Sequence, residues 1–104
     1  MAILMISALP PGDGERRGRL VSLARELADG GSVQLLLYGD GVFNLVAGSR
    51  AAGELTAGPL ELYAVAEDVA ARGLEGRLVP EARPVDYDRV VQLVLEAERT
   101  VTGV

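Results

Sequence analysis

The chain of 104 residues contains no cysteine, histidine, lysine or tryptophan. Without cysteine and histidine, disulfides, thiolate zinc sites and histidine-based catalytic triads cannot form. Without lysine there is no amine for Schiff-base chemistry. A free-standing enzyme is therefore the least favoured class of function, because the usual catalytic side chains are missing. The sequence predicts neither a cofactor nor a metal centre.

Basic charge is scarce and of one type. The net charge is −5, and all ten basic residues are arginine. General nucleic-acid binding depends on neutralising phosphates, so an acidic chain without lysine is a poor candidate for it. No apolar run reaches the length of a membrane span, and the apolar start of the chain is too short for a signal peptide. We therefore expect a cytoplasmic protein with no membrane partner and no direct general nucleic-acid binding.

Short apolar runs recur along the chain and are separated by helical patterns. At this length a single domain over residues 1–104 is expected. Continuous apolar runs are typical of strands that are buried on both faces of a parallel sheet. Such strands, some of them short, are predicted at Ala2–Ser7, Val33–Tyr38, Leu60–Val65, Arg83–Val85 and Val101–Val104.

Helices are predicted between these strands, at Glu15–Ala28, Val42–Ala47, Glu67–Arg72 and after Asp86, with a looser helix or loop over 48–58. The last helix has the clearest amphipathic pattern of the chain, with Leu93 at the margin of its apolar stripe. That stripe consists of Tyr87, Val90, Val91, Val94 and Leu95. The alternation predicts an α/β fold: a mostly parallel open sheet of about five strands with helices on both faces, in three layers as in flavodoxin-like and Rossmann-like proteins.

Acidic residues follow the first three predicted strands. Gly-Asp-Gly turns place Asp13 and Asp40 after the first two strands, and Glu67 and Asp68 follow the third. Ligands of open parallel sheets bind beyond the carboxyl ends of the strands, so these carboxylates are expected at one edge. The favoured interpretation is structural, with glycine making the turns and aspartate capping the helices. A magnesium site is a minor alternative, and a phosphate site is disfavoured by the aspartates.

Several residues near the second turn and in the last helix are candidates for a subunit interface or a ligand crevice. They are Tyr38, Gly41, Val42, Phe43, Leu45 and Leu93. Core packing is the default for apolar residues, but an exposed aromatic side chain at a turn is a common interface anchor. A small domain has difficulty burying all of the apolar side chains among them, which are Val42, Phe43, Leu45 and Leu93. We therefore expect at least Phe43 or Leu93 to lie in a subunit interface.

Three motifs, taken in order, resemble the DsrH/TusB family. They are Asp40-Gly41-Val42, the block from Tyr63 to Leu74, and Val85-Asp86-Tyr87. The similarity extends over nearly the whole chain, and the order and spacing of the motifs are more specific than any one of them. The resemblance implies a DsrEFH-like fold, shared with the DsrE/TusD and DsrF/TusC proteins.

The resemblance also implies partners. In the family the three related subunits form one complex, which receives sulfur from a TusA-like donor and passes it to a DsrC/TusE-like acceptor. The DsrE/TusD cysteine lies at the start of the helix after the third strand, and the matching position here is close to Ala66. Because the chain has no cysteine, it cannot carry a persulfide itself.

Two functions follow as hypotheses. The resemblance predicts a non-catalytic subunit that supports persulfide transfer by a cysteine-bearing partner, toward 2-thiolation of the wobble uridine in tRNA. The residues alone allow an alternative, a standalone homo-oligomeric module that binds a small ligand in the acidic crevice at the carboxyl edge. A homo-oligomer of the isolated chain is compatible with either.

Overall fold

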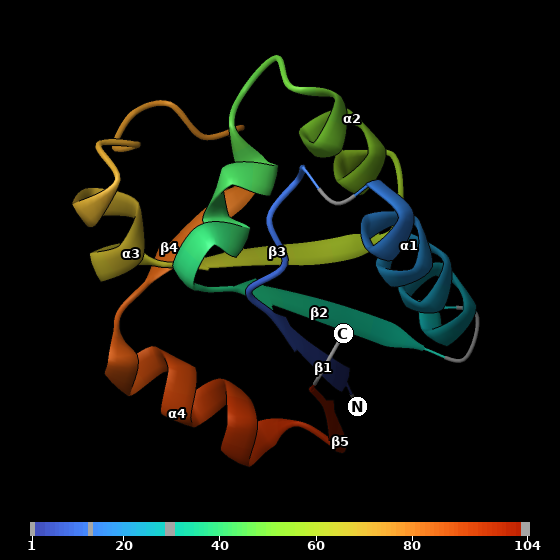
Figure 1. The fold of residues 1–104 in the computed structure, drawn as a ribbon. Coiled ribbons are helices and arrows are strands. Elements are labelled where there is room, and N and C mark those ends of the chain that lie inside the picture. Colours follow the sequence, from blue (N-terminus) through green and yellow to red (C-terminus); the bar gives the residue numbers. More distant parts are fainter. Residues whose placement is uncertain (1, 13, 29–30, 103–104) are drawn as a thin grey trace.

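Five strands form one fully parallel sheet in the order β4-β3-β2-β1-β5. The computed structural model describes residues 2–12, 14–28 and 31–102. The predicted α/β fold with a parallel sheet and helices on both faces is confirmed (Figure 1). The strands are β1 (Ala2–Ser7), β2 (Ser32–Leu37), β3 (Leu60–Val65), β4 (Ala82–Val85) and β5 (Arg99–Val101).

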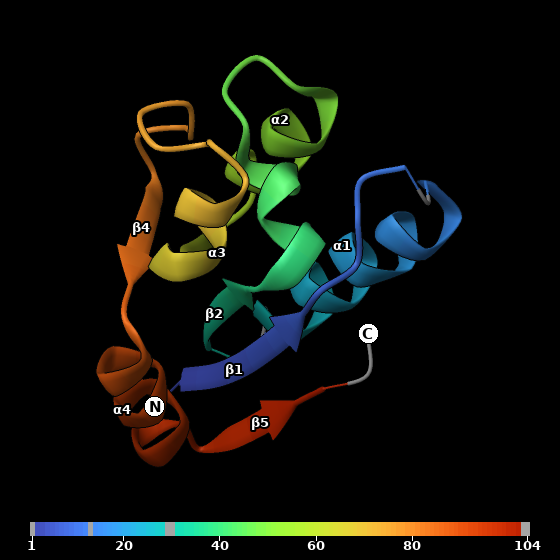
Figure 2. The ribbon, with the colours of Figure 1, turned by 60° about the vertical axis from the view of Figure 1, so that its left-hand side comes forward.

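The helices divide unequally between the two faces of the sheet. On one face lie α1 (Gly14–Ala28), the 3-10 helix η1 (Gly39–Leu45), α2 (Arg50–Thr56) and α3 (Ala66–Ala71). On the other face lies α4 (Tyr87–Glu96), alone among the described helices (Figure 2). The first four elements fill the connections from β1 to β4, and α4 carries the chain across the opposite face to β5. None of the helices in the described ranges is long and apolar enough to cross a membrane.

Each face of the sheet has its own buried cluster. Leu35 and Leu37 of β2 point into the larger cluster, under α1 and η1, whereas Leu36 points into the smaller one, under α4. Successive strand residues alternate between faces, so burial of both faces requires a continuous apolar run. This explains why the central strands are readable from the sequence.

Some connections differ from the sequence expectation. The predicted helix over Val42–Ala47 is a 3-10 helix that begins earlier, at Gly39. The looser segment contains α2, where the Ser49 hydroxyl accepts a hydrogen bond from the backbone N–H of Ala52 at 3.1 Å. The predicted strand over Val101–Val104 is instead β5 over Arg99–Val101, and residues 103 and 104 lie outside the described part.

The orientation of α4 differs from what its apolar stripe suggests. Asp86 caps the helix as predicted, accepting the backbone N–H of Arg89 at 2.9 Å. The sheet, however, is contacted by Leu93 with Val90, whereas four residues of the stripe face outward. The apolar arc of α4 is wider than its contact with the sheet, and periodicity does not show which half of a wide arc is buried. The outward residues are Tyr87, Val91, Val94 and Leu95.

Candidate functional site at the carboxyl edge of the sheet

The start of η1 and the end of α3 are joined by a charged network beyond the ends of β2 and β3. Arg72 donates from Nε to Asp40 Oδ1 at 3.0 Å, and its NH1 lies 3.6 Å from Asp68 Oδ1. Asp68 Oδ2 also accepts the backbone N–H of Gly39 at 2.9 Å. Gly39 has φ +54, a conformation that glycine adopts without a steric penalty. Two predicted site aspartates are therefore brought together, with an arginine between them.

This pairing changes the interpretation of the acidic residues at the carboxyl edge of the sheet. Asp40 and Asp68 share one guanidinium, so they do not form an uncompensated negative crevice there. Glu67 is exposed beside them, and Asp13 lies outside the described residues. Within the described ranges no group of three or more carboxylate, imidazole or thiolate side chains could hold a metal ion. The capping interpretation of Asp40 and Asp68 is replaced by a tie between two helical elements.

The residues around the second turn separate into buried and exposed members. Gly41 and Val42 are buried, as is Leu45. Phe43 and Tyr38 remain 36% and 45% exposed. The expectation that Val42, Leu45 and Leu93 resist burial is wrong, because each of them fills one of the two cores of the domain. Leu93 is 1% exposed and therefore cannot contact another subunit directly.

Sequence reasoning did not single out Asn44, which is buried in η1. Its amide Nδ2 donates to the carbonyl oxygens of Leu9 at 2.7 Å and Gly41 at 2.9 Å. The bond to Leu9 fixes the connection after β1 against η1, and the bond to Gly41 lies within η1. The only available signal was a polar residue within an apolar stretch, Val42–Val46, which is weak evidence because such a residue is equally compatible with an exposed position.

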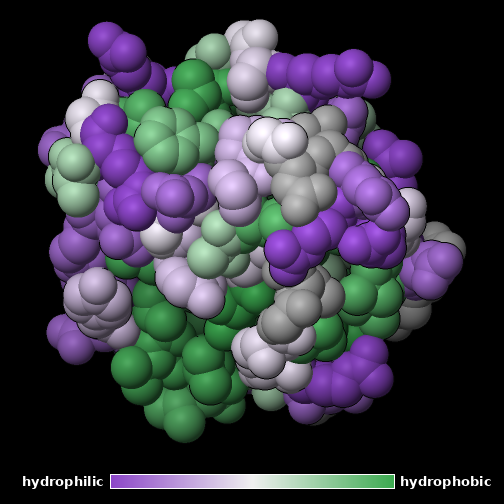
Figure 3. All heavy atoms as spheres, viewed as in Figure 1, coloured by the Kyte–Doolittle hydropathy of each residue, from purple (hydrophilic) through white to green (hydrophobic). Residues whose placement is uncertain are grey.

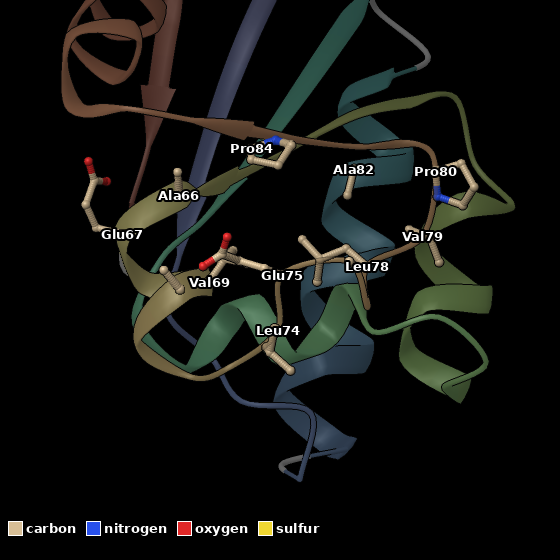
Figure 4. Close-up of a pocket in the computed structure, with 12 residues that line it drawn as sticks. Ala66, Glu67, Val69, Leu74, Glu75, Leu78, Val79, Pro80, Ala82 and Pro84 are labelled. Atoms are coloured by element: carbon tan, nitrogen blue, oxygen red, sulfur yellow. The ribbon is translucent and has the colours of Figure 1, made fainter.

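A pocket of about 630 Å³ lies between α3, β4 and the segment that joins them (Figure 4). After β3 the chain enters α3 on one face, and after β4 it enters α4 on the other. Neighbouring strands whose connections leave to opposite faces create a crevice at their carboxyl ends, where ligands of such sheets bind. Ala66 and Glu67 line the pocket at this end, beside Pro84.

The lining of the pocket is mostly apolar. Val69, Leu74, Leu78 and Ala82 contribute aliphatic surface, and Glu67 and Glu75 are its ionisable side chains. None of the lining residues carries a thiol, hydroxyl or imidazole group. Such a pocket can accommodate an apolar or cationic group, but it offers no thiol that could carry a persulfide. Ala66, predicted as a site residue from the resemblance, thus lies at the pocket, whereas Tyr38 does not line it.

Solved structures define the class of protein as a small α/β fold with a five-stranded parallel sheet. The ychN protein from E. coli superposes with a TM-score of 0.78 at 17% identity, covering 98% of each chain. A protein of unknown function from Methanobacterium thermoautotrophicum superposes with a TM-score of 0.77 at 21% identity, covering 97% of this chain and 96% of that one. At these identities the likeness concerns the fold alone.

Sequence comparison gives the family. The family model described as DsrH like protein matches residues 16–100. Protein TusB of Escherichia coli O1:K1 is 40% identical over 75 residues, which cover 72% of this chain and 77% of that protein. Protein TusB of Shigella flexneri is 39% identical over 75 residues, with the same coverage. The chain belongs to the DsrH/TusB family of sulfur-relay subunits, as its three motifs predict.

Proposed function

We propose that the protein is a non-catalytic subunit of a DsrE/F/H-like sulfur-relay complex. It supports persulfide transfer by a cysteine-bearing DsrE/TusD-like subunit, beside a DsrF/TusC-like subunit, toward 2-thiolation of the wobble uridine in tRNA. A DsrC/TusE-like protein is the proposed acceptor. Family membership supports the relay, and the lack of cysteine supports the accessory role.

The position of Ala66 carries this proposal. It lies at the start of α3, at the crevice between the carboxyl ends of β3 and β4. The resemblance puts the DsrE/TusD cysteine close to this position. Here the position has a methyl group at the rim of an apolar pocket, where no thiol is present to carry sulfur. Exposed Phe43 and Tyr38, with Glu67 at the pocket, are proposed contacts for partner subunits.

The alternative of a homo-oligomeric ligand-binding module receives support from the pocket volume. It loses the feature on which it was based, because Asp40 and Asp68 are paired with Arg72. A ligand for the observed pocket would be apolar or cationic rather than a metal ion, since aliphatic side chains and two glutamates line it. The relay subunit remains the better supported function.

Reconstitution tests the proposed function. The chain is co-expressed with the DsrE-like and DsrF-like subunits of the same host, and the mass of the assembly is measured by sedimentation. Transfer of radiolabelled sulfur from a TusA-like donor to a DsrC-like acceptor is then followed with and without this chain. We expect a complex of all three subunits, in which transfer requires the chain although no label attaches to it. Recovery of the chain only as a lone monomer, or transfer at an unchanged rate without it, contradicts the proposal.

A further inference from the structure

The side of α4 that points away from the sheet is apolar. Tyr87, Val91, Val94 and Leu95 are 60%, 55%, 41% and 77% exposed, and we call these four residues the outer face of α4. They form most of the large hydrophobic side chains that the described residues expose, the others being Tyr38 and Phe43. Figure 3 shows hydrophobic surface gathered at the bottom of the molecule, over α4. Contiguous apolar surface of this kind marks interaction sites in small proteins.

The fold does not need this surface for its own packing. Leu93 is buried against the sheet, with Val90 and Ala97 packed beside it, and these residues anchor α4 to the smaller core. The outer face lies on an exposed flank of the same helix, and none of its four residues is among those that pack in that core. The smaller core therefore does not depend on these four apolar side chains, which leaves them available to a partner.

One edge of the outer face is acidic. Asp88, Gln92 and Glu96 follow one another at intervals of four residues, so they form a row along the helix, and all three are exposed. We call this row the acidic edge. Arg89 donates from NH1 to Gln92 Oε1 at 3.3 Å from the other side of the row. The two carboxylates of the row have no ion-pair partner among the described residues.

A second copy of this chain fits the surface poorly. In a two-fold pair of antiparallel helices, symmetry brings the same edge of both helices together. Asp88 of one copy would then lie beside Glu96 of the other, and like charges at such a spacing are destabilising. In a parallel pair the acidic edge would face the other border of the partner's outer face, where Tyr87 and Val94 lie, and carboxylates buried against apolar groups are costly.

We infer that the outer face of α4 docks an amphipathic helix of a non-identical subunit, apolar along its centre and bordered on one edge by arginine or lysine. The apolar residues provide the burial, and the acidic edge selects the basic border and rejects a second copy. This inference rests on the proposed function, because the relay complex supplies the non-identical subunits. A helix of ten residues is about 15 Å long, so the partner must also contact surface beyond α4 to reach about 800 Å² on each side.

The test measures binding of the full chain to the co-purified DsrE-like and DsrF-like subunits of the same host. Val91→Glu with Leu95→Glu places two charges in the centre of the outer face, and we expect the dissociation constant to rise about tenfold or more. Ser22→Glu is the matched control, because Ser22 is exposed on α1 at the other face of the sheet. It should bind like the wild type, and circular dichroism should show all of these chains folded.

The charge part of the inference has a separate readout. Asp88→Asn with Glu96→Gln should weaken binding at low salt and flatten its salt dependence. The same variant should self-associate more than the wild type in sedimentation, because like-charge repulsion between copies is removed. Stronger or unchanged binding to the partner subunits would show that the docked helix has no basic border facing the acidic edge.

The remaining outcomes distinguish a failure of the proposed docking surface from a failure of the proposed function. If the wild type binds the two subunits and the Val91→Glu, Leu95→Glu variant binds equally well, the inference is wrong and the proposed function stands. If the wild type fails to bind them, both are wrong. A wild-type homodimer that the same variant converts to monomers would show that a second copy occupies the outer face, which also overturns the inference.

Discussion

Gly41 occupies a position in η1 that has no room for a side chain. A Cβ atom there would lie 2.8 Å from the carbonyl oxygen of Ser7 and 3.1 Å from Cα of Ala8. Both are backbone atoms at the end of β1, so a shift of η1 would separate it from the sheet. We expect Gly41→Ala to lower the free energy of unfolding by about 1–3 kcal/mol. Urea denaturation followed by circular dichroism measures this loss.

The same substitution at Gly53 is the control for Gly41→Ala. Gly53 lies within α2, and a Cβ atom there would meet nothing within 4 Å. Alanine in place of glycine inside a helix stabilises by about 0.5–1 kcal/mol, because the unfolded chain loses conformational freedom. The two alanine substitutions should therefore change the free energy of unfolding in opposite directions. A stabilising Gly41→Ala would show that η1 is free to move away from β1.

Arg72 ties η1 to α3, and its removal should have a small but measurable effect. Its side chain is 25% exposed, against 64% for Asp40 and 27% for Asp68, so solvent screens the pairs only partly. We expect Arg72→Ala to lower the free energy of unfolding by about 1 kcal/mol, with a smaller loss at high salt. Arg50→Ala is the comparison, since Arg50 is 88% exposed in its pair with Glu54, and it should have almost no effect. Equal losses of unfolding free energy for Arg72→Ala and Arg50→Ala would show that Arg72 does not link η1 to α3.

At the scale of secondary-structure elements, the sequence predicts where a strand or helix forms better than it predicts which face of a helix is buried. The apolar runs of β1 to β3 are readable because both faces of these strands are buried. The apolar pattern of α4 does not show which face is buried. A helix that packs one face on the sheet and another on a partner is apolar on both faces. The sequence pattern of Tyr87, Val91 and Leu95 is equally compatible with a core and with an interface. Only the packing of Leu93 in three dimensions separates them.

The orientation of α4 makes a sharp prediction for two leucines that lie close in sequence. Leu93→Ala removes a side chain from the smaller core and should lower the free energy of unfolding by about 2–5 kcal/mol. Leu95→Ala changes an exposed side chain and should stay within about 0.5 kcal/mol of the wild type. Thermal and urea unfolding of the isolated chain measure both. A larger loss for Leu95→Ala than for Leu93→Ala would mean that α4 packs on the sheet through its outer face.

At the scale of the whole molecule, the candidate site is only partly predictable. Asp40 and Asp68 follow neighbouring parallel strands, so their position at the same edge of the sheet is predictable from the parallel topology. Their pairing with Arg72 depends on where α3 ends. The pocket depends on the segment before β4, which is held by bonds from Val79 N–H to Leu45 O at 2.9 Å and from Ala47 N–H to Arg77 O at 2.8 Å. Such backbone bonds between loops have no sequence pattern.

The last prediction concerns what stabilises the whole molecule. A ligand that binds only the folded state raises its melting temperature, by an amount that grows with the ratio of ligand concentration to dissociation constant. Because Arg72 holds both aspartates, millimolar Mg²⁺ should raise the melting temperature no more than sodium chloride of equal ionic strength. Addition of the DsrE-like and DsrF-like subunits should raise it, since we propose that one of them docks on the outer face of α4. A rise with Mg²⁺ and none with the subunits would favour the ligand-binding module and count against the relay subunit.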